Sequence, residues 1–150
     1  MPNNRGLPRT LSWVAPTDRF TREKTPGSSV NPEEVMKSIA EAAPRRGLPI
    51  IGPKRGLFLD EVVKEYGPKT ILEVGTLVGY SAIRMARLLK KGGRITCVEV
   101  NEDMAQVARS NVEKAGLADR VEVIVGDAKN ILPTIEGDFD RISCDNFAWA

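Results

Sequence analysis

The second half of the chain alternates short apolar segments with longer amphipathic ones. The apolar segments predict strands over residues 70–74, 94–100, 121–125 and 139–144, and the amphipathic ones predict helices over 80–91, 101–115 and 128–132. Strands separated by helices form parallel sheets through right-handed crossovers. The pattern therefore predicts an α/β fold, a parallel sheet with flanking helices, over residues 30–150.

Two further helices are expected before the first strand. Asn31 can act as an N-cap, Pro32 suits the first helical position and Glu34 completes a capping-box pattern, so one helix should occupy 32–43. Its apolar stripe is expected to consist of Val35, Met36, Ile39, Ala40 and Ala43. A second helix is expected over 56–66, after an extended segment with two prolines. Its inward residues are expected to be Leu57, Leu59, Val62 and Val63.

Residues 1–29 contain scattered prolines and no apolar periodicity, which predicts a flexible basic arm. Residues 1–55 hold ten Lys and Arg but five Asp and Glu, although the net charge of the whole chain is only +2. A net charge this small does not favour nucleic acid as a partner. A solvated arm is the more common meaning of a basic leading segment, although such an arm can also meet a negative surface.

The sequence also bears on the compartment. No apolar run reaches the roughly 20 residues that a membrane span needs, and no signal-peptide pattern opens the chain. Cys97 and Cys144 both fall in expected strands, which predicts two buried thiols in a reducing compartment. We therefore expect a cytoplasmic protein without a membrane partner.

The strongest functional signal is the loop that follows the first strand, Glu73-Val74-Gly75-Thr76-Leu77-Val78-Gly79-Tyr80-Ser81. Gly75 allows a sharp turn and a close approach of the backbone to a ligand. Gly79 stands where the next helix begins, and backbone N–H groups there favour an anionic ligand group, to which Ser81 would add a hydroxyl. Considered alone, the two glycines could serve only the turn.

Acidic residues follow the next two strands. Glu99 ends the second strand, about twenty residues after the glycine loop, where an acid binds a ribose diol in dinucleotide-type sites. Asp127 follows the third strand and is placed to border a base. Alone, Glu99 could be an exposed strand-end acid and Asp127 an N-cap. The order of glycine loop, acid and acid along the strands favours a nucleotide-type site.

The glycine spacing narrows the choice of nucleotide. In the dinucleotide fingerprint G-x-G-x-x-G, the middle glycine lets a pyrophosphate lie against the backbone, and Leu77 occupies that position here. The spacing therefore weakens the case for a nicotinamide or flavin cofactor. A ligand with a ribose, a base and only a small carboxylate, such as S-adenosylmethionine (SAM), fits better.

Residues from about Leu48 to Asp145 resemble the catechol O-methyltransferase-like, metal-dependent O-methyltransferases. The segments that carry the resemblance are Ile51-Gly52-Pro53-Lys54-Arg55-Gly56, Leu72-Glu73-Val74-Gly75, Gly79-Tyr80-Ser81, Val98-Glu99-Val100-Asn101 and Val125-Gly126-Asp127-Ala128. The resemblance implies a Rossmann-like class I methyltransferase fold, SAM as cofactor, and a small catechol-like or phenolic acceptor.

The resemblance also implies roles for single residues. Ile51 would contact SAM through its backbone, and Gly75 and Ser81 would hold its methionine portion, with Glu73 and Gly79 in the same cofactor site. Glu99 would bind the ribose, while Asp127 and Ala128 would flank the adenine. Asp145 would be the family's first metal-binding aspartate, for a Mg²⁺ ion.

The chain departs from the family pattern after Asp145. Ala148 stands where the family has a lysine that acts as base, and no later strands supply the other metal ligands. A single carboxylate is a poor magnesium site. We therefore expect a fold that lacks its last strands, by truncation or by a shifted reading frame near residues 139–140, and an incomplete metal site. The exposed edge of the fourth strand would favour a homodimer.

Two functions of different classes follow from these observations. The first is SAM-dependent methyl transfer to a hydroxyl of a small acceptor. The second is a catalytically inactive cofactor-binding or interaction module derived from the same family, which the missing lysine and metal ligands favour. A nicotinamide-dependent oxidoreductase is a third possibility that the glycine spacing disfavours.

Overall fold

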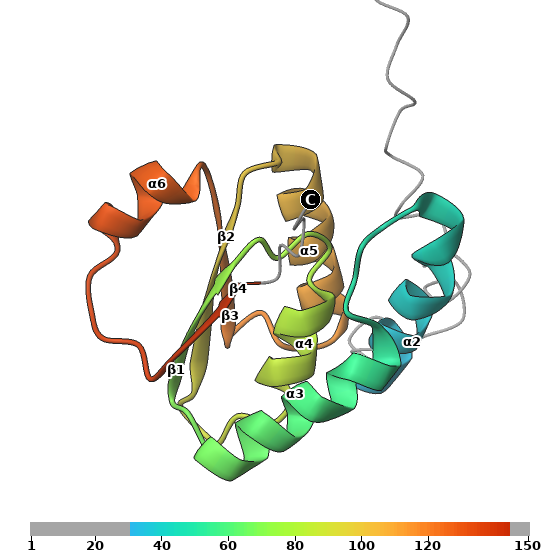
Figure 1. The fold of residues 1–150 in the computed structure, drawn as a ribbon, viewed down its shortest axis with the longest axis horizontal. Helices are drawn as coiled ribbons and strands as arrows, with labels where there is room; N and C mark the ends of the chain where they lie inside the picture. Colours follow the sequence, from blue (N-terminus) through green and yellow to red (C-terminus); the bar gives the residue numbers. More distant parts are fainter. Residues whose placement is uncertain (1–30, 145–150) are drawn as a thin grey trace, which may run out of the picture.

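The computed structural model describes residues 31–144 (Figure 1). Its elements in chain order are α2 (Pro32–Ala42), the short turn η2 (Pro44–Arg46), α3 (Gly52–Tyr66), β1 (Thr70–Val74), α4 (Tyr80–Ala86), β2 (Arg94–Glu99), α5 (Glu102–Lys114), β3 (Val121–Val125), α6 (Ala128–Ile131), η3 (Leu132–Thr134) and β4 (Arg141–Cys144). The arm expected over residues 1–29 and the expected metal residue Asp145 lie outside the described residues.

The four strands form one parallel sheet in the order β3-β2-β1-β4. The register pairs Val74 with Val98 and Glu99 with Val125, so the carboxyl ends of β1, β2 and β3 meet at one edge. The bounds of β1 and β3 match the predicted strands. The predicted α/β fold with a parallel sheet is confirmed.

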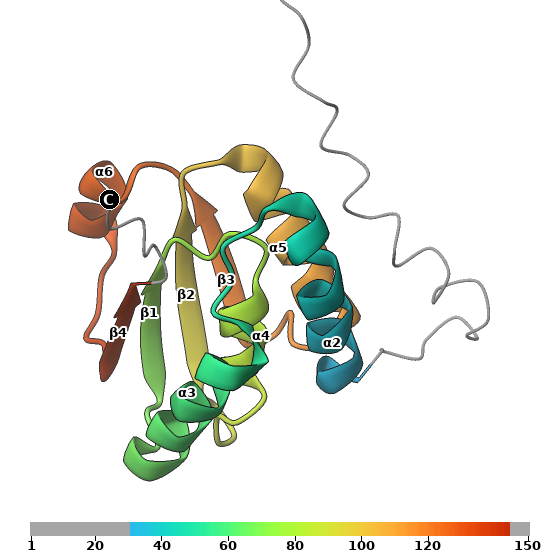
Figure 2. The ribbon, with the colours of Figure 1, turned by 45° about the vertical axis from the view of Figure 1, so that its right-hand side comes forward.

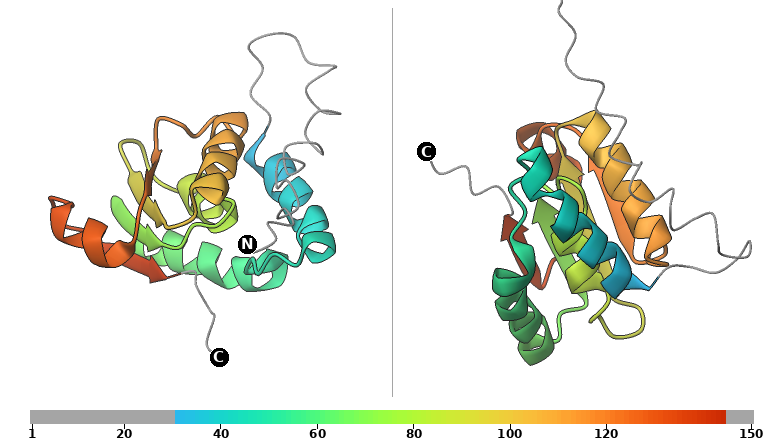
Figure 3. Two further views of the ribbon diagram at one scale, coloured as in Figure 1. Left: turned by 90° about the horizontal axis from the view of Figure 1, so that it is seen from above. Right: turned by 90° about the vertical axis from the view of Figure 1, so that its right-hand side faces the viewer.

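The helices are distributed unevenly over the two faces of the sheet. Figures 2 and 3 show α2, α3, α4 and α5 on one side, whereas α6 lies on the other. The core lies between the sheet and the four-helix side, where Ile71, Ile83 and Ile95 are at most 1% exposed. All residues of α4 are buried, because this helix lies between the sheet and the outer helices α2 and α3.

Helix α2 begins as its sequence predicts. The side chain of Asn31 accepts a hydrogen bond from the backbone N–H of Glu33 at 3.0 Å, which satisfies one of the free donors of the first turn. The residues that α2 buries, Val35, Met36 and Ile39, belong to its predicted apolar stripe. The N-cap and the buried face of this helix are therefore confirmed.

Helix α3 differs from its prediction in two respects. It begins at Gly52 rather than near Gly56, because Pro53 lies in the first turn, where its missing N–H is not needed. Of its predicted inward residues, Val63 is buried and Leu59 packs partly buried against the core, but Leu57 is 62% exposed and does not face inward. The residues that α3 buries are Gly56, Asp60 and Val63.

An ion network explains which face α3 buries. The carboxylate of Asp60 accepts hydrogen bonds from Nε and Nη2 of Arg84 at 2.9 and 2.8 Å, and from Nη1 and Nη2 of Arg87 at 3.1 and 2.8 Å. Arg87 also pairs with Glu33 of α2 at 3.2 Å. We call these four residues the Asp60 network. It joins α2, α3 and α4, and apolar periodicity gives no sign of it.

Helix α4 ends earlier than predicted. The residues after Ala86 turn more tightly, since the N–H groups of Leu88 and Leu89 bond to carbonyls three residues before them. This change to three-residue turns satisfies carbonyls that the end of an α-helix leaves free.

Among the helices of residues 31–144, none combines the length and the apolar character that crossing a membrane requires.

Strand β4 lies at one edge of the described sheet, as expected, and is shorter than predicted. It begins at Arg141 because the preceding residue, Asp140, binds the start of β1 with its side chain. The carboxylate of Asp140 accepts hydrogen bonds from the backbone N–H groups of Lys69 and Thr70 at 2.7 and 3.1 Å. The predicted burial of both cysteines is half wrong: Cys97 is buried, but Cys144 is exposed at this edge. Dimerisation through β4 stays a prediction.

Candidate cofactor site

A cavity of about 310 Å³ opens at the carboxyl ends of the strands. Its walls come from the loops that follow β1, β2 and β3, together with Pro49 from the segment before α3. The lining residues are Pro49, Val74, Gly75, Leu77, Val98, Glu99, Val100, Gly126, Asp127 and Ala128. Four of the predicted site residues, Gly75, Glu99, Asp127 and Ala128, are therefore brought together around one cavity.

Glu99 is the charged residue at the centre of this site. Its side chain is buried, with 6% of the residue exposed, so it is not an exposed strand-end acid. One carboxylate oxygen accepts the N–H of Leu77 at 2.7 Å, and the other accepts the N–H of Asn101 at 3.1 Å. A carboxylate has about four acceptor positions, so each oxygen can accept one more hydrogen bond. That arrangement suits two neighbouring hydroxyls of a ligand.

The glycine loop adopts backbone conformations that only some residues tolerate. Gly75 and Gly79 have φ values of 82° and 84°, and Leu77 has a φ of 52°, which is uncommon for a residue with a side chain. The bond from Leu77 N–H to Glu99 holds this turn against the end of β2. Gly79 also packs so closely on Ala108 of α5 that an added Cβ would lie 3.3 Å from its backbone.

Glu73 and Ser81 lie beneath the loop and are not among the residues that line the cavity. The Ser81 hydroxyl donates to the Glu73 carboxylate at 2.5 Å, and both residues are at most 1% exposed. The Sγ of Cys97 lies 3.8 Å from the other oxygen of Glu73. This buried contact ties the start of α4 to β1 directly under the glycine loop.

Asp127 has the position of an N-cap as well as a place in the cavity wall. Its side chain accepts the N–H of Lys129 at 2.9 Å and so begins α6. Ala128, the first residue of α6, also lines the cavity. The capping interpretation of Asp127 is therefore correct, and it does not exclude a contact with a ligand.

Sequence reasoning did not find several residues that shape the site. Pro49, Leu77 and Val100 line the cavity. Ile51, which was predicted to contact the cofactor, is the N-cap of α3 and lies two residues after Pro49. The place of Pro49 in the wall depends on how α3 docks, so no local pattern could have identified it.

The described residues do not fit a metal site. Within residues 31–144, no group of three or more His, Cys, Asp or Glu side chains is arranged to hold a metal ion. Asp145, the residue predicted for Mg²⁺, lies outside this range.

Comparison with known proteins gives this geometry a family. The sequence profile of a family described as O-methyltransferase matches residues 27–148. The chain belongs to this O-methyltransferase family. Among curated relatives, the catechol O-methyltransferase of Sus scrofa is 44% identical over 95 residues, covering 63% of this chain and 51% of that protein. The catechol O-methyltransferase of Niastella koreensis is 42% identical over 114 residues, covering 72% of this chain and 50% of that protein.

Solved structures of O-methyltransferases share the fold of this chain. An O-methyltransferase from Bacillus cereus, in complex with SAH, aligns with a TM-score of 0.68 and 35% identity, covering 90% of this chain and 62% of that one. TomG from Streptomyces achromogenes, in complex with SAM, aligns with a TM-score of 0.68 and 29% identity, covering 93% and 63%. This chain spans about half the length of the curated relatives it matches.

Proposed function

We propose that this chain binds SAM in the cavity at the carboxyl ends of β1, β2 and β3. The observation that carries the proposal is the buried Glu99 carboxylate, which faces the cavity with one acceptor position free on each oxygen. A ribose diol would donate to both oxygens at once. Asp127 and Ala128 would then flank the adenine, since they form the wall beside Glu99.

The methionine portion of SAM would extend from Glu99 toward Gly75 and the start of α3. Gly75 has no side chain and a positive φ, so the backbone can approach the ligand closely. Ile51 would contribute its backbone at the opposite wall. We assign Glu73, Gly79 and Ser81 to the same site, where the contact between Ser81 and Glu73 holds the loop from beneath.

We propose further that this protein transfers a methyl group to a hydroxyl of a small catechol-like or phenolic molecule. The acceptor oxygen would form a bond to the sulfonium methyl as the bond from carbon to sulfur breaks, giving a methyl ether, SAH and a proton. Holding the two reactants in line is the main contribution of such a site. The likeness to catechol O-methyltransferases supports this acceptor class.

The two cysteines support a cytoplasmic location, which we also propose. Cys97 and Cys144 are both free thiols, and exposed free thiols such as that of Cys144 persist best in a reducing compartment.

Methyl transfer is tested by incubating the chain with SAM labelled on the methyl group, Mg²⁺ and catechol. We expect the wild-type chain to form more labelled methyl ether than a Glu99→Ala control. Cofactor binding without product would favour the inactive binding module instead. A thermal shift caused by NAD but not by SAM would overturn both and favour the oxidoreductase.

A further inference from the structure

Two separate segments contribute walls to the proposed SAM site. One wall is Pro49, just before α3, and the other is Gly75 and Leu77, just before α4. The distance between these walls depends on how α3 docks against α4. The contacts that hold α3 against α4 therefore influence the shape of the cavity.

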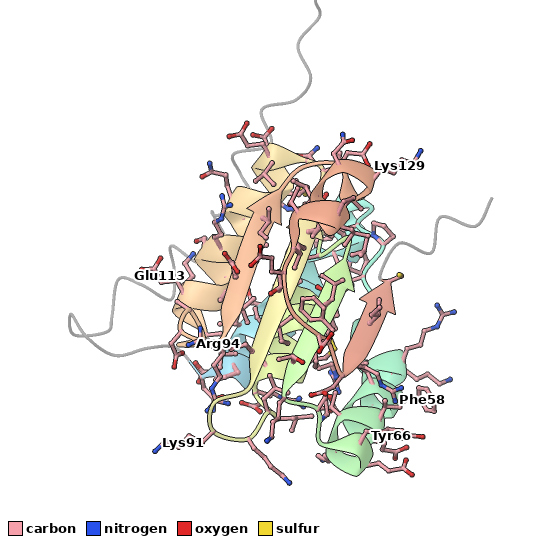
Figure 4. The ribbon with its side chains drawn as sticks, turned by 90° about the vertical axis from the view of Figure 1, so that its left-hand side faces the viewer. Phe58, Tyr66, Lys91, Arg94, Glu113 and Lys129 are labelled. Atoms are coloured by element: carbon pink, nitrogen blue, oxygen red, sulfur yellow. The ribbon has the colours of Figure 1, made fainter. Side chains whose placement is uncertain are left out.

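Apolar packing does little to fix the docking of α3. Of the three residues that α3 buries, Gly56, Asp60 and Val63, only Val63 is large and apolar. Leu59 also packs against the core but stays partly exposed. Phe58 points away from the body of the protein (Figure 4) and is 71% exposed, whereas the ring of Tyr66, which is 64% exposed, has its centre 4.3 Å from the guanidinium carbon of Arg141 in β4. Apolar contact is not directional, so Val63 and Leu59 alone would leave the position of the helix poorly defined.

The Asp60 network supplies the missing direction. Arg84 and Arg87 each present a planar guanidinium to the same carboxylate, and a two-bond fork of this kind fixes orientation as well as distance. Gly56 makes room for the Arg84 guanidinium, since an added Cβ there would overlap it. Gly56 and Asp60 are four residues apart and so lie on one face of α3.

The network also reaches the start of α4. The Nη1 of Arg84 donates to the hydroxyl of Tyr80 at 3.1 Å, and Tyr80 directly follows the glycine loop. Arg84 therefore lies one helical turn after the glycine loop. Gly56, against which the Arg84 guanidinium packs, lies one turn after Gly52, where α3 begins. One side chain links the beginnings of the two helices that carry the two walls.

We propose that Asp60, Arg84 and Arg87 are positioning residues for the methionine portion of SAM. They set the separation of the Pro49–Ile51 segment from the glycine loop and touch neither the ligand nor the reacting atoms. The adenosine portion lies on the loops after β2 and β3 and does not depend on α3. This inference rests on the proposed function, because it assigns the two ends of SAM to different parts of the cavity.

Two ligands that share the adenosine group separate positioning from general stability. SAH contains the amino-acid portion, whereas 5′-methylthioadenosine lacks it. We expect Asp60→Asn and Arg84→Lys to weaken SAH binding by about tenfold to a hundredfold, because small misplacements have effects of this size. Binding of 5′-methylthioadenosine should change by no more than about twofold, since its contacts are distant from α3.

The measurement is calorimetric titration at a low temperature at which circular dichroism shows each variant to be folded. Glu61→Gln, which changes an exposed carboxylate next to Asp60, is the matched control and should bind both ligands like the wild type. Arg84→Lys decides the matter if Asp60→Asn does not fold, because lysine keeps the charge but loses the fork.

Each other outcome overturns the inference. If the affinities for SAH and 5′-methylthioadenosine fell equally, the network would only stabilise the fold. If folded variants kept their SAH affinity, the network would have no influence on the cofactor site. A folded wild-type chain that binds neither ligand would overturn the proposed function and this inference with it. SAH affinity that stays at the wild-type level in both Asp60→Asn and Arg84→Lys would overturn the positioning role and leave the proposed function standing.

Discussion

Replacing Glu99 with alanine is expected to weaken SAH binding by about a hundredfold or more while leaving the chain folded. The variant loses two hydrogen bonds from the ribose diol to a carboxylate, and each such charge-assisted bond contributes about 1.5–3 kcal/mol. A loss of about 1.4 kcal/mol weakens binding tenfold. The N–H groups of Leu77 and Asn101 also lose their acceptor, but water can replace it, because Leu77 lines the open cavity and Asn101 is exposed to solvent.

Calorimetric titration with SAH and thermal unfolding together check this prediction. Glu122→Ala, which removes an exposed carboxylate from β3, is the control and should leave affinity unchanged. Glu99→Gln keeps one acceptor oxygen and should fall between the wild type and Glu99→Ala. An alanine variant that binds SAH as tightly as the wild type would show that Glu99 does not hold the ribose.

Replacing Asp60 with alanine is expected to lower the free energy of unfolding by about 3–5 kcal/mol at neutral pH. Removing one partner of a buried ion pair leaves the other charge without compensation, which is the reason for the large effect. Here two guanidinium groups lose their shared carboxylate, and only Glu33, which is largely exposed, remains to pair with Arg87. Urea unfolding of Asp60→Ala beside Glu61→Ala measures the difference, and the control should change stability by less than about 0.5 kcal/mol.

The effect of Asp60 should depend on pH in a defined direction. Burial raises the pKa of Asp60, but the hydrogen bonds from Arg87 and Arg84 outweigh it, and the pKa lies below its ordinary value of 3.8. A carboxyl with a lowered pKa contributes stability that is fully present above the ordinary pKa and is lost as the pH falls through the pKa of the folded state. The difference between wild type and Asp60→Ala should therefore be constant from neutral pH to about pH 5 and shrink below about pH 4.

Acid unfolding curves test this window. Asp140 also has a lowered pKa, because the backbone N–H groups of Lys69 and Thr70 bind its carboxylate, but wild type and variant share this contribution. The difference between the two proteins therefore isolates Asp60. A stability difference that persists unchanged at pH 3 would contradict the assignment of a charged Asp60 as the centre of the network.

The parts of the fold that follow from local chemistry were predictable from the sequence. Runs such as Val121–Val125 specify a strand, and Asn31 specifies a helix start, because each depends on neighbouring residues only. The meeting of Gly75, Glu99 and Asp127 at one edge was also predictable, since parallel strands align their carboxyl ends. The topology of the sheet thus carried most of the site.

The features that the sequence did not reveal depend on contacts between distant segments. The buried face of α3 includes Asp60, which binds Arg84 of α4 and Arg87 directly after that helix. These contacts leave Leu57 exposed, although the apolar pattern predicted it to be buried. Cys144 is exposed because its strand is an edge of the described sheet, which the composition of β4 does not indicate. One sequence signal could have found the network: Asp60, Arg84 and Arg87 are charged residues within otherwise amphipathic or apolar helical segments.

The most direct test of the central claim is calorimetric titration of the purified chain with SAH, which binds without turnover. We expect a one-to-one isotherm with a dissociation constant on the order of micromolar, an affinity that a cavity of this size can provide. The same chain must show the circular dichroism of a folded α/β protein. A folded chain that gives no binding heat with SAH at several temperatures, and no thermal shift, would contradict the proposal that this cavity is a SAM site.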